Sequence, residues 1–535
     1  MDGHRREVST RSWRVLTYGV PLAFLGLFCV YPLLAILDRG LRGDGDPPLD
    51  VLTDPVTREV VWFTIWQAFA STALTIAVAT PTAYVLGRYR FRGRSLVSAI
   101  VVVPFVLPTL VVALAFLAIL PDRLERGWAP ILVAHTFFNV AVVVRIVGTF
   151  WANLDPRVTE AAATLGASPA ARAREIILPL LAPALAAAAA IVFLFSFTSF
   201  GIVLILGGPR YATIEAEIYN QAVRLFDLRS AAVLSIVQLV CVVAAIWVAT
   251  RLERGLAVTG TLRVERDTLK RVRSRRDKLV VGLSLGGLGL FLGLPLAVLV
   301  ERSFAVGGGH GFDAYEALTD RTSVLLAAPW EAIVNSIVYA TAAAAIAVVV
   351  GGLAAFAVAG SRGSRGLDTL VLLPLGASAV MLGLGFLIAF DTAPIDFRAA
   401  PWIVPVAQAL VAIPFVVRIL VPTLRSIDPR LRDAAAVLGA SPARVTREID
   451  LPIVARGLAV AAGFAFAISL GEFGATVFLA RPDRPTLPVA IFRFLGRPGE
   501  LNLATAYALA VVLMTVTVVS VLLVERVRLR RGGWF

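Results

Sequence analysis

The sequence has few of the residues that bind metals or form disulfides. Only two cysteines and three histidines occur among 535 residues. Cys29 and Cys241 both lie inside apolar runs, which excludes a disulfide framework and a thiolate metal site. His4, His135 and His310 are too scattered along the chain to form a cluster. We therefore expect no metal site in this chain.

Lysine is almost absent, and so is any motif that binds phosphate. Lys270 and Lys278 are the only lysines, neither follows a glycine-rich turn, and no GxxxxGK[ST] pattern occurs. No cluster of His, Asp or Glu lies at a membrane face, as an integral membrane enzyme would require. We expect a protein that has no catalytic residues and no cofactor of its own.

Acidic residues are outnumbered, 36 against 50 basic ones, and the net charge is +14. An excess of this kind can indicate nucleic-acid binding. Here the basic residues gather in short loops between apolar runs, where the preference of cytoplasmic loops for Arg and Lys accounts for them. We expect a lipid bilayer around this chain and no nucleic-acid partner.

Long apolar runs dominate the chain. Hydrophobic residues make up 58% of it, and the mean hydropathy is +0.83. Because a bilayer core about 30 Å thick needs about 20 apolar residues per helix, the sequence predicts an all-α polytopic membrane protein with about 12 transmembrane helices. We expect them near residues 15–37, 60–87, 96–120, 129–151, 182–206, 231–250, 279–300, 333–359, 367–390, 402–423, 457–479 and 501–524.

The distribution of arginine predicts the orientation in the membrane. Basic residues gather before the first run, at 88–94, at 251–278, at 362–365 and at 526–531. These segments and both termini are therefore expected on the cytoplasmic side. The segment 251–278 holds ten basic and four acidic residues, which is typical of a solvated linker.

The clearest pattern is an internal repeat. Residues 155–179 read DPRVTEAAATLGASPAARAREIILP, and residues 428–452 read DPRLRDAAAVLGASPARVTREIDLP. At a constant offset of 273 residues, 17 of these 25 positions are identical. The chain is therefore interpreted as a tandem duplication, with a first half at 1–250, the linker at 251–278 and a second half at 279–535.

Each copy of the repeat predicts two short helices separated by a glycine. Alanine-rich segments precede Gly166 and Gly439. A Ser-Pro pair follows each glycine and is typical of a helix start, with serine as the cap and proline in the first turn. We expect Pro179 and Pro452 to end the second helix. An ordinary interhelical elbow would also fit one copy, but two nearly identical copies favour a functional loop.

This loop resembles the signature of one family, the membrane permease subunits of binding-protein-dependent ATP-binding-cassette importers. In that signature a cytoplasmic Glu-Ala-Ala segment is followed by glycine and then by an apolar-Pro ending. The resemblance implies that both loops are coupling helices that dock on an ATPase subunit. The matching residues are Glu160, Ala161, Ala162, Gly166, Ser168 and Pro169, and Asp433, Ala434, Ala435, Gly439, Ser441 and Pro442. Asp433 departs from the pattern, because the family has Glu there.

The resemblance covers the whole chain and implies its fold and partners. It implies two tandem six-helix halves of the type I (MetI-like) permease fold in the bacterial inner membrane. It also implies two copies of an ABC ATPase subunit, which carry ATP and Mg, and an extracytoplasmic substrate-binding protein. The segments 63–69, 131–139, 197–221 and 469–488 are most similar to fused permeases of the thiamine and ferric-iron group. Thiamine, or a thiamine phosphate, is the cargo we expect, with ferric iron as the alternative.

Four residues are candidates for the translocation pathway. The segment around Glu472 and Phe473 matches the one around Ser199 and Phe200 at the same offset of 273. Polar groups inside apolar helices are costly and so merit a functional hypothesis. A carboxylate and aromatic faces would favour a cation, although a helix contact remote from the pathway explains these residues equally well.

A second class of transporter also fits part of the pattern. Ion- or proton-coupled secondary transporters often have twelve helices in two repeats, and Glu472 and His135 could then relay protons. This alternative leaves the two duplicated loops without a role.

Overall fold

The computed structural model describes residues 15–121, 124–255, 269–321, 324–360, 365–391, 397 and 400–529. Among these residues, ten helices are long and apolar enough to cross a membrane, or up to twelve if two bent pairs count as one span each. This confirms the predicted all-α architecture. The expected basic segments at the chain start and at 362–364, and most of the linker (256–268), lie outside the described residues.

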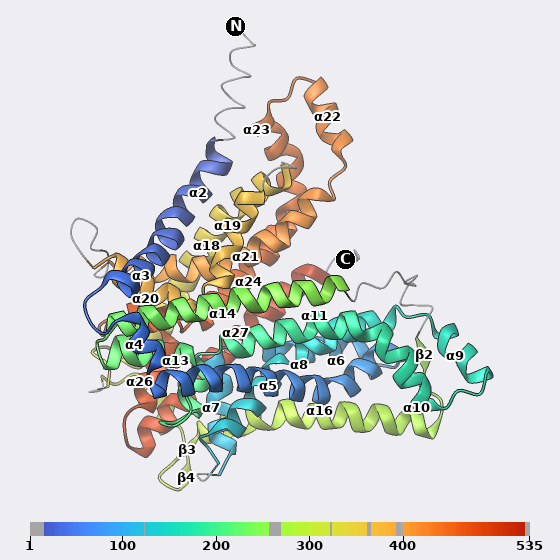
Figure 1. Ribbon diagram of the computed structural model, residues 1–535, viewed down its shortest axis with the longest axis horizontal. Coiled ribbons are helices and arrows are strands. Elements are labelled where there is room, and N and C mark those ends of the chain that lie inside the picture. Colours follow the sequence, from blue (N-terminus) through green and yellow to red (C-terminus); the bar gives the residue numbers. More distant parts are fainter. Residues whose placement is uncertain are drawn as a thin grey trace. The chain divides into compact units, whose positions relative to one another are not determined.

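The helices form two compact units that do not follow the two halves of the chain (Figure 1). Unit 1 contains Met1–Val51, Ile218–Ile236 and Ser303–Phe535, and unit 2 contains Leu52–Glu217 and Val237–Arg302. The first helices of each half have thus joined the unit built mainly from the other half. The boundaries between the units fall inside α4 (Pro48–Thr53), α13 (Ile214–Tyr219) and α14 (Leu228–Gly255), and at the end of α16 (Arg275–Arg302).

Unit 1 is built mainly from the second half of the chain. Its helices, in chain order, are η1(Val15–Gly19), α2(Val20–Leu25), η2(Gly26–Val30), α3(Tyr31–Arg42), α4(Pro48–Thr53), η4(Asn220–Arg224), α17(Asp313–Glu316), α18(Pro329–Gly360), α19(Arg365–Gly376), α20(Ala379–Ala389), α21(Ile403–Arg425), α22(Pro429–Val437), α23(Pro442–Val445), η5(Thr446–Asp450), α24(Leu451–Gly471), α25(Thr476–Leu479), α26(Leu487–Leu495) and α27(Glu500–Leu529). The strands β3(Ala305–Val306) and β4(Gly309–His310) pair in antiparallel fashion.

The N-terminal helices of unit 1 pack on α18 and α20. The Tyr18 hydroxyl donates to the carbonyl of Ala357 (3.1 Å), and the rings of Phe28 and Phe386 stack with centroids 6.2 Å apart. Small residues on α18, such as Ala340 and Ala347, are fully buried, which allows close helix packing of the kind common in membranes.

Unit 2 is built mainly from the first half. Its helices are α5(Pro55–Arg88), α6(Arg94–Val106), α7(Thr109–Ile119), α8(Trp128–Ala152), α9(Pro156–Thr164), α10(Pro169–Arg172), η3(Ala173–Ile177), α11(Leu178–Phe197), α12(Gly201–Leu206) and α16(Arg275–Arg302), with part of α13 and α14. The strands β1(Tyr89–Arg90) and β2(Lys270–Arg271) pair in parallel.

The first helix of the second half, α16, packs on α5 and α7 within unit 2. The hydroxyls of Thr82 and Ser284 are 3.2 Å apart, and the rings of Phe137 and Phe291 meet edge to face with centroids 6.0 Å apart. These contacts join segments about 150 to 200 residues apart in sequence.

Two of the predicted spans are bent rather than continuous. The segments expected at 96–120 and 367–390 each fold as two helices with a bend of 97° between them, α6 with α7 and α19 with α20. Leu107 is extended at the first bend because the ring of Pro108 disfavours helical backbone in the preceding residue. At the second bend the Ser378 side chain caps the new helix by accepting from the amide of Met381 (3.2 Å).

Candidate coupling loops and central helix breaks

The two copies of the repeat fold into the same local structure. In unit 2, Asp155 caps α9 by accepting from the Arg157 amide (3.0 Å), and in unit 1, Asp428 caps α22 by accepting from the Arg430 amide (2.9 Å). The sequence prediction of a short helix, a glycine break and a second helix is confirmed for both copies. Figure 1 shows each loop beyond the ends of the long helices of its own unit, α9 and α10 in unit 2 and α22 and α23 in unit 1.

The glycine in each loop adopts a conformation that other residues rarely take. Gly166 and Gly439 both have φ of 85°, in the left-handed region where only glycine avoids a steric penalty. The Gly166 amide donates to the carbonyl of Ala163 (3.1 Å) and the Ala167 amide to that of Ala162 (3.0 Å). The equivalent bonds around Gly439 are 3.0 Å each, so both helices end in the same Schellman-like turn.

The second helix of each loop begins at the predicted serine. The Ser168 side chain accepts from the Ala171 amide (3.1 Å), and the Ser441 side chain accepts from the Arg444 amide (3.3 Å). These bonds satisfy amides that have no partner within the first helical turn.

The prediction that Pro179 and Pro452 end the second helix is wrong. The chain continues through the π-helical turns η3 and η5 into α11 and α24, with each proline in the first turn of the following helix. Proline lacks an amide hydrogen and crowds the preceding turn. The wider π turn accommodates that missing bond, so the surface loop and the spanning helix form one continuous rod.

Both loops expose apolar side chains that the sequence prediction did not single out. Leu165 is 88% exposed, and Val437 and Leu438 are both 87% exposed. They come just before the turn glycine, in the same short helix or cap as the exposed carboxylates of Glu160 and Asp433. The sequence signal was the shared Leu-Gly pair before Ala-Ser-Pro. An exposed leucine at the tip of each loop is a surface suited to a protein partner.

One ion pair distinguishes the loop of unit 1. The Arg432 Nε lies 2.8 Å from a carboxylate oxygen of Asp450, and the same guanidinium donates to the Leu424 carbonyl (3.3 Å). This pair ties α22 to the turn that begins α24. At the matching positions of the first half the chain has Thr159 and Ile177, so the unit 2 loop lacks this bridge.

The four pathway candidates lie at matching helix breaks, each inside its own unit. Ser199 and Phe200 separate α11 from α12 in unit 2, and Glu472 and Phe473 follow the end of α24 in unit 1. All four side chains are buried. The rings of Phe473 and Phe492 pack with centroids 5.4 Å apart.

The Glu472 carboxylate caps the helix that follows it. It accepts from the amides of Ala475 (2.7 Å) and Thr476 (3.1 Å) and from the Thr476 hydroxyl. A carboxylate on the first amides of a helix is favoured by the helix dipole. In unit 2 the matching Ser199 Oγ is buried and has no hydrogen-bond partner among the described residues.

Several buried polar residues of the first half bond to one another, both across helices and within α8. The Gln67 side chain donates to the Ser196 carbonyl (2.8 Å), Ser71 Oγ lies 3.0 Å from His135 Nδ1, and Asn139 donates to the His135 carbonyl (3.0 Å). The first two bonds join α5 to α11 and α5 to α8 in unit 2. Each bond pairs a polar group that is costly to leave unpaired inside apolar helices.

This geometry defines a multi-pass helical membrane protein with two matching surface loops. A family model described as the binding-protein-dependent transport system inner membrane component matches residues 79–258 and 323–531, once in each half. Together these matches cover most of the chain, and the protein belongs to this family of inner-membrane transport components.

Named relatives cover the whole chain or one half of it. The chain is 29% identical over 560 residues to the thiamine transport system permease protein ThiP of Brucella abortus (strain 2308), covering 99% of this chain and 98% of that protein. It is 28% identical over 495 residues to ThiP of Escherichia coli (strain K12), covering 87% and 88%. A permease of Salmonella paratyphi A named for 2-aminoethylphosphonate transport, PhnV, is 31% identical over 245 residues, covering 45% of this chain and 91% of its own.

Proposed function

We propose that this chain is the permease subunit of an ATP-driven importer and forms the translocation pathway for a small solute. The observation that carries the proposal is the pair of matching loops, each capped at Asp155 or Asp428 and each with an apolar side chain almost fully exposed at its tip. Two similar docking surfaces suit two copies of one partner, and a secondary transporter would give them no role.

The partners follow from this proposal. Two copies of an ABC ATPase subunit dock on the loops and carry the ATP and Mg, since the chain has no phosphate-loop motif. A binding protein delivers the solute on the opposite side. The loops and both termini are then cytoplasmic, as the basic segments predict. Because η3 and η5 join each loop to a spanning helix without a break, movement of the ATPase subunits is transmitted directly to α11 and α24.

The proposed cargo is thiamine or a thiamine phosphate. The support is similarity over nearly the full length to permeases named for thiamine transport. We place Ser199, Phe200, Glu472 and Phe473 at the pathway, with Glu472 acting through the helix break that it caps. Ferric iron is the competing cargo in the test below.

Uptake by cells that lack this protein tests the proposal. Labelled thiamine and labelled ferric iron are supplied to cells complemented with wild type, with Leu165→Asp plus Leu438→Asp, or with the matched control Leu165→Met plus Leu438→Met. We expect thiamine uptake with the wild type and the methionine pair. The aspartate pair should lose it about ten-fold or more, because a charge replaces the apolar contact at each loop.

Two further readouts separate the parts of the proposal. Immunoblots of membranes check that the aspartate pair is inserted, and co-purification checks whether the ATPase subunit is lost. Uptake by the aspartate pair at the wild-type rate would overturn the coupling role of the loops. If cells that lack the protein lose iron uptake and keep thiamine uptake, the cargo is iron and not thiamine, and the proposal of an importer still stands.

A further inference from the structure

Two segments far apart in sequence are held together at one end of unit 2. Strand β1 follows α5, and β2 comes just before α16 at the end of the linker. Their residues pair in parallel, with Tyr89 opposite Lys270 and Arg90 opposite Arg271. A two-residue strand pair is weak by itself, so side chains must contribute to holding it.

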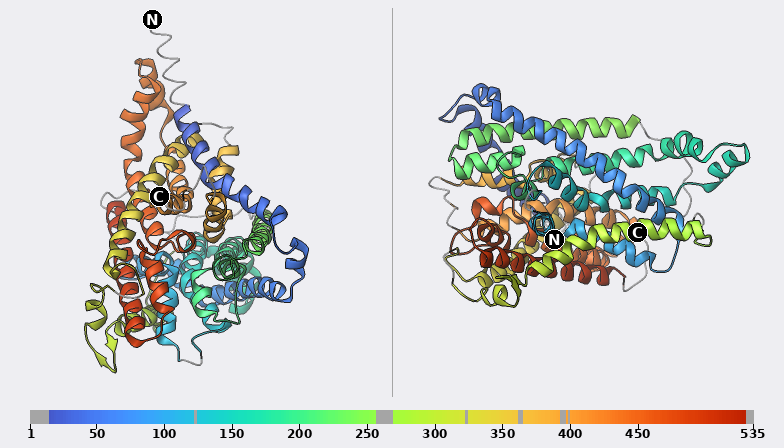
Figure 2. Two further views of the ribbon diagram at one scale, coloured as in Figure 1. Left: turned by 90° about the vertical axis from the view of Figure 1, so that its left-hand side faces the viewer. Right: turned by 90° about the horizontal axis from the view of Figure 1, so that it is seen from below.

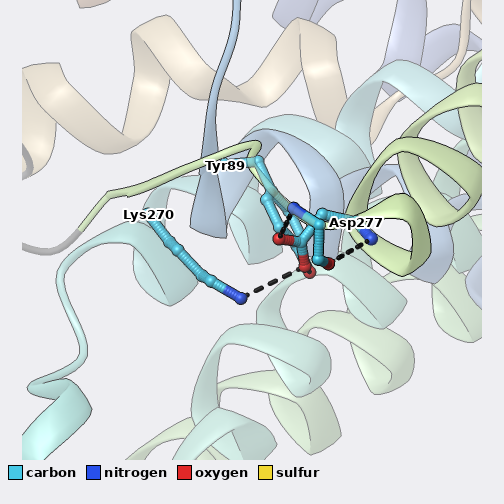
Figure 3. Close-up of polar contacts among 4 residues, drawn as sticks. Tyr89, Lys270 and Asp277 are labelled. Carbon is cyan, nitrogen blue, oxygen red and sulfur yellow. Dashed lines mark hydrogen bonds and ion pairs between the residues drawn. The ribbon is translucent and has the colours of Figure 1, made fainter.

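The Asp277 carboxylate supplies those side-chain bonds (Figure 3). It accepts from the Tyr89 hydroxyl (3.2 Å), from the Lys270 ammonium (3.1 Å) and from the Ser274 amide (3.2 Å). Burial raises the pKa of the Tyr89 hydroxyl, which therefore stays protonated and donates. The carboxylate is buried and fully engaged in these bonds.

The two described segments that meet at this cluster expose basic side chains, whereas their acidic side chain is buried. Asp277 is the only acidic residue in 88–94 and 269–278. Seven basic residues of these segments are exposed and form no ion pair with any residue the structure describes. We call them the basic surface: Arg90, Arg92, Arg271, Arg273, Arg275, Arg276 and Lys278. Seven cations without an ion-pair partner in the described part of the chain, on two tied segments, attract an anionic partner.

The basic surface continues directly into exposed apolar side chains. Leu96 and Ile100 on α6, and Leu279 and Leu283 on α16, are all exposed. These residues lie in the first three turns of helices that belong to candidate spans. In a bilayer, the ends of spanning helices reach the depth where lipid headgroups meet acyl chains. Cations beside an apolar helix face match an amphiphile with a negative headgroup, whereas an acidic peptide would leave the apolar side chains without a partner.

We propose that the basic surface binds the headgroups of anionic phospholipids, with their acyl chains along Leu96, Leu279 and the neighbouring helix faces. The Tyr89–Lys270–Asp277 cluster positions the two segments for this contact. The site holds the start of α16, itself a candidate span, at the level of the lipid headgroups. It does not depend on which solute the protein carries.

Native mass spectrometry of the full-length protein tests this site. The protein is extracted from bilayers of phosphatidylcholine and phosphatidylglycerol, and the retained lipids of each kind are counted. The surface variant carries Arg90→Gln, Arg92→Gln, Arg273→Gln and Arg276→Gln. We expect its preference for phosphatidylglycerol to fall about ten-fold, because each cation near an anionic surface adds to the attraction.

Two matched controls make the result specific. Lysine at the same four positions keeps the charge and should keep the preference. Four exposed arginines in loops that the positive-inside rule predicts on the opposite side of the membrane, Arg126, Arg210, Arg321 and Arg497, are changed to Gln and should leave the preference unchanged. An unaltered preference in the surface variant, or an equal fall in the distant variant, would overturn the proposal. If the surface variant loses the ATPase subunit but keeps its lipid preference, the basic surface is a protein interface instead. The loop helices α9 and α10 lie at this end of unit 2 (Figure 2).

Discussion

At the scale of single residues, Glu472 shows how burial changes the role of a charge. Sequence reasoning placed it in the pathway because a carboxylate in an apolar segment is costly. The structure adds three bonds to Ala475 and Thr476, which stabilise the carboxylate at the start of α25. The bonds give Glu472 a structural role at the helix break, whichever part it plays in the proposed pathway.

Changing Glu472 should separate these two roles. Glu472→Ala leaves two buried amides without an acceptor and should cost about 2 kcal/mol or more of stability, whereas Glu472→Gln keeps one acceptor oxygen and should cost about half as much. Thermal unfolding of the purified protein measures this order. Wild-type stability in Glu472→Ala would contradict the capping role. A stable Glu472→Gln that has lost uptake would place the charge itself in the pathway.

At the scale of elements, the loop helices depend on their turn glycines. Gly166 and Gly439 both have φ of 85°, and nothing lies within 4 Å of where a Cβ would be. A side chain at either glycine would therefore lower stability through backbone conformation and not through a steric clash. This makes the loops suitable for a local test that leaves the spanning helices unchanged.

Gly166→Ala should loosen the end of α9. A left-handed conformation costs alanine about 1 kcal/mol, which corresponds to about five-fold more frequent opening of the last turn. Hydrogen exchange of the amides at 165–167 measures it. Gly282→Ala on α16, where a Cβ also meets nothing within 4 Å and the backbone is helical, is the matched control and should not change exchange in the loop. Unchanged exchange in Gly166→Ala would show that the turn relaxes without cost.

At the scale of the whole molecule, each compact unit contains helices from both halves of the chain. The N-terminal helices pack on α18 and α20, and α16 packs on α5 and α7. The family model matches 79–258 and 323–531 and leaves out these first helices. The repeat therefore reflects the order of segments along the sequence, whereas the two units reflect which helices pack together.

A chain divided after residue 260 should therefore still assemble. When 1–260 and 261–535 are co-expressed with a tag on one fragment, we expect the other fragment to co-purify, since both units need helices from both. Gly385→Leu is the control that should weaken this association. A Cβ at Gly385 would lie 2.9 Å from the Cβ of Pro32, so a larger side chain forces α3 away from α20. Fragments that purify separately would contradict the exchange of helices.

The sequence by itself determined the membrane class, the repeat and the local structure of the loops. Apolar run length, the Ser-Pro caps and the position of Gly166 act over a few residues, and local backbone physics fixes their outcome. The tertiary structure alone decided the pairing of Tyr89 with Lys270 and the exchange of the first helices between the two units. These features depend on contacts between distant segments, and hydropathy shows that a helix is buried without showing which helix packs against it.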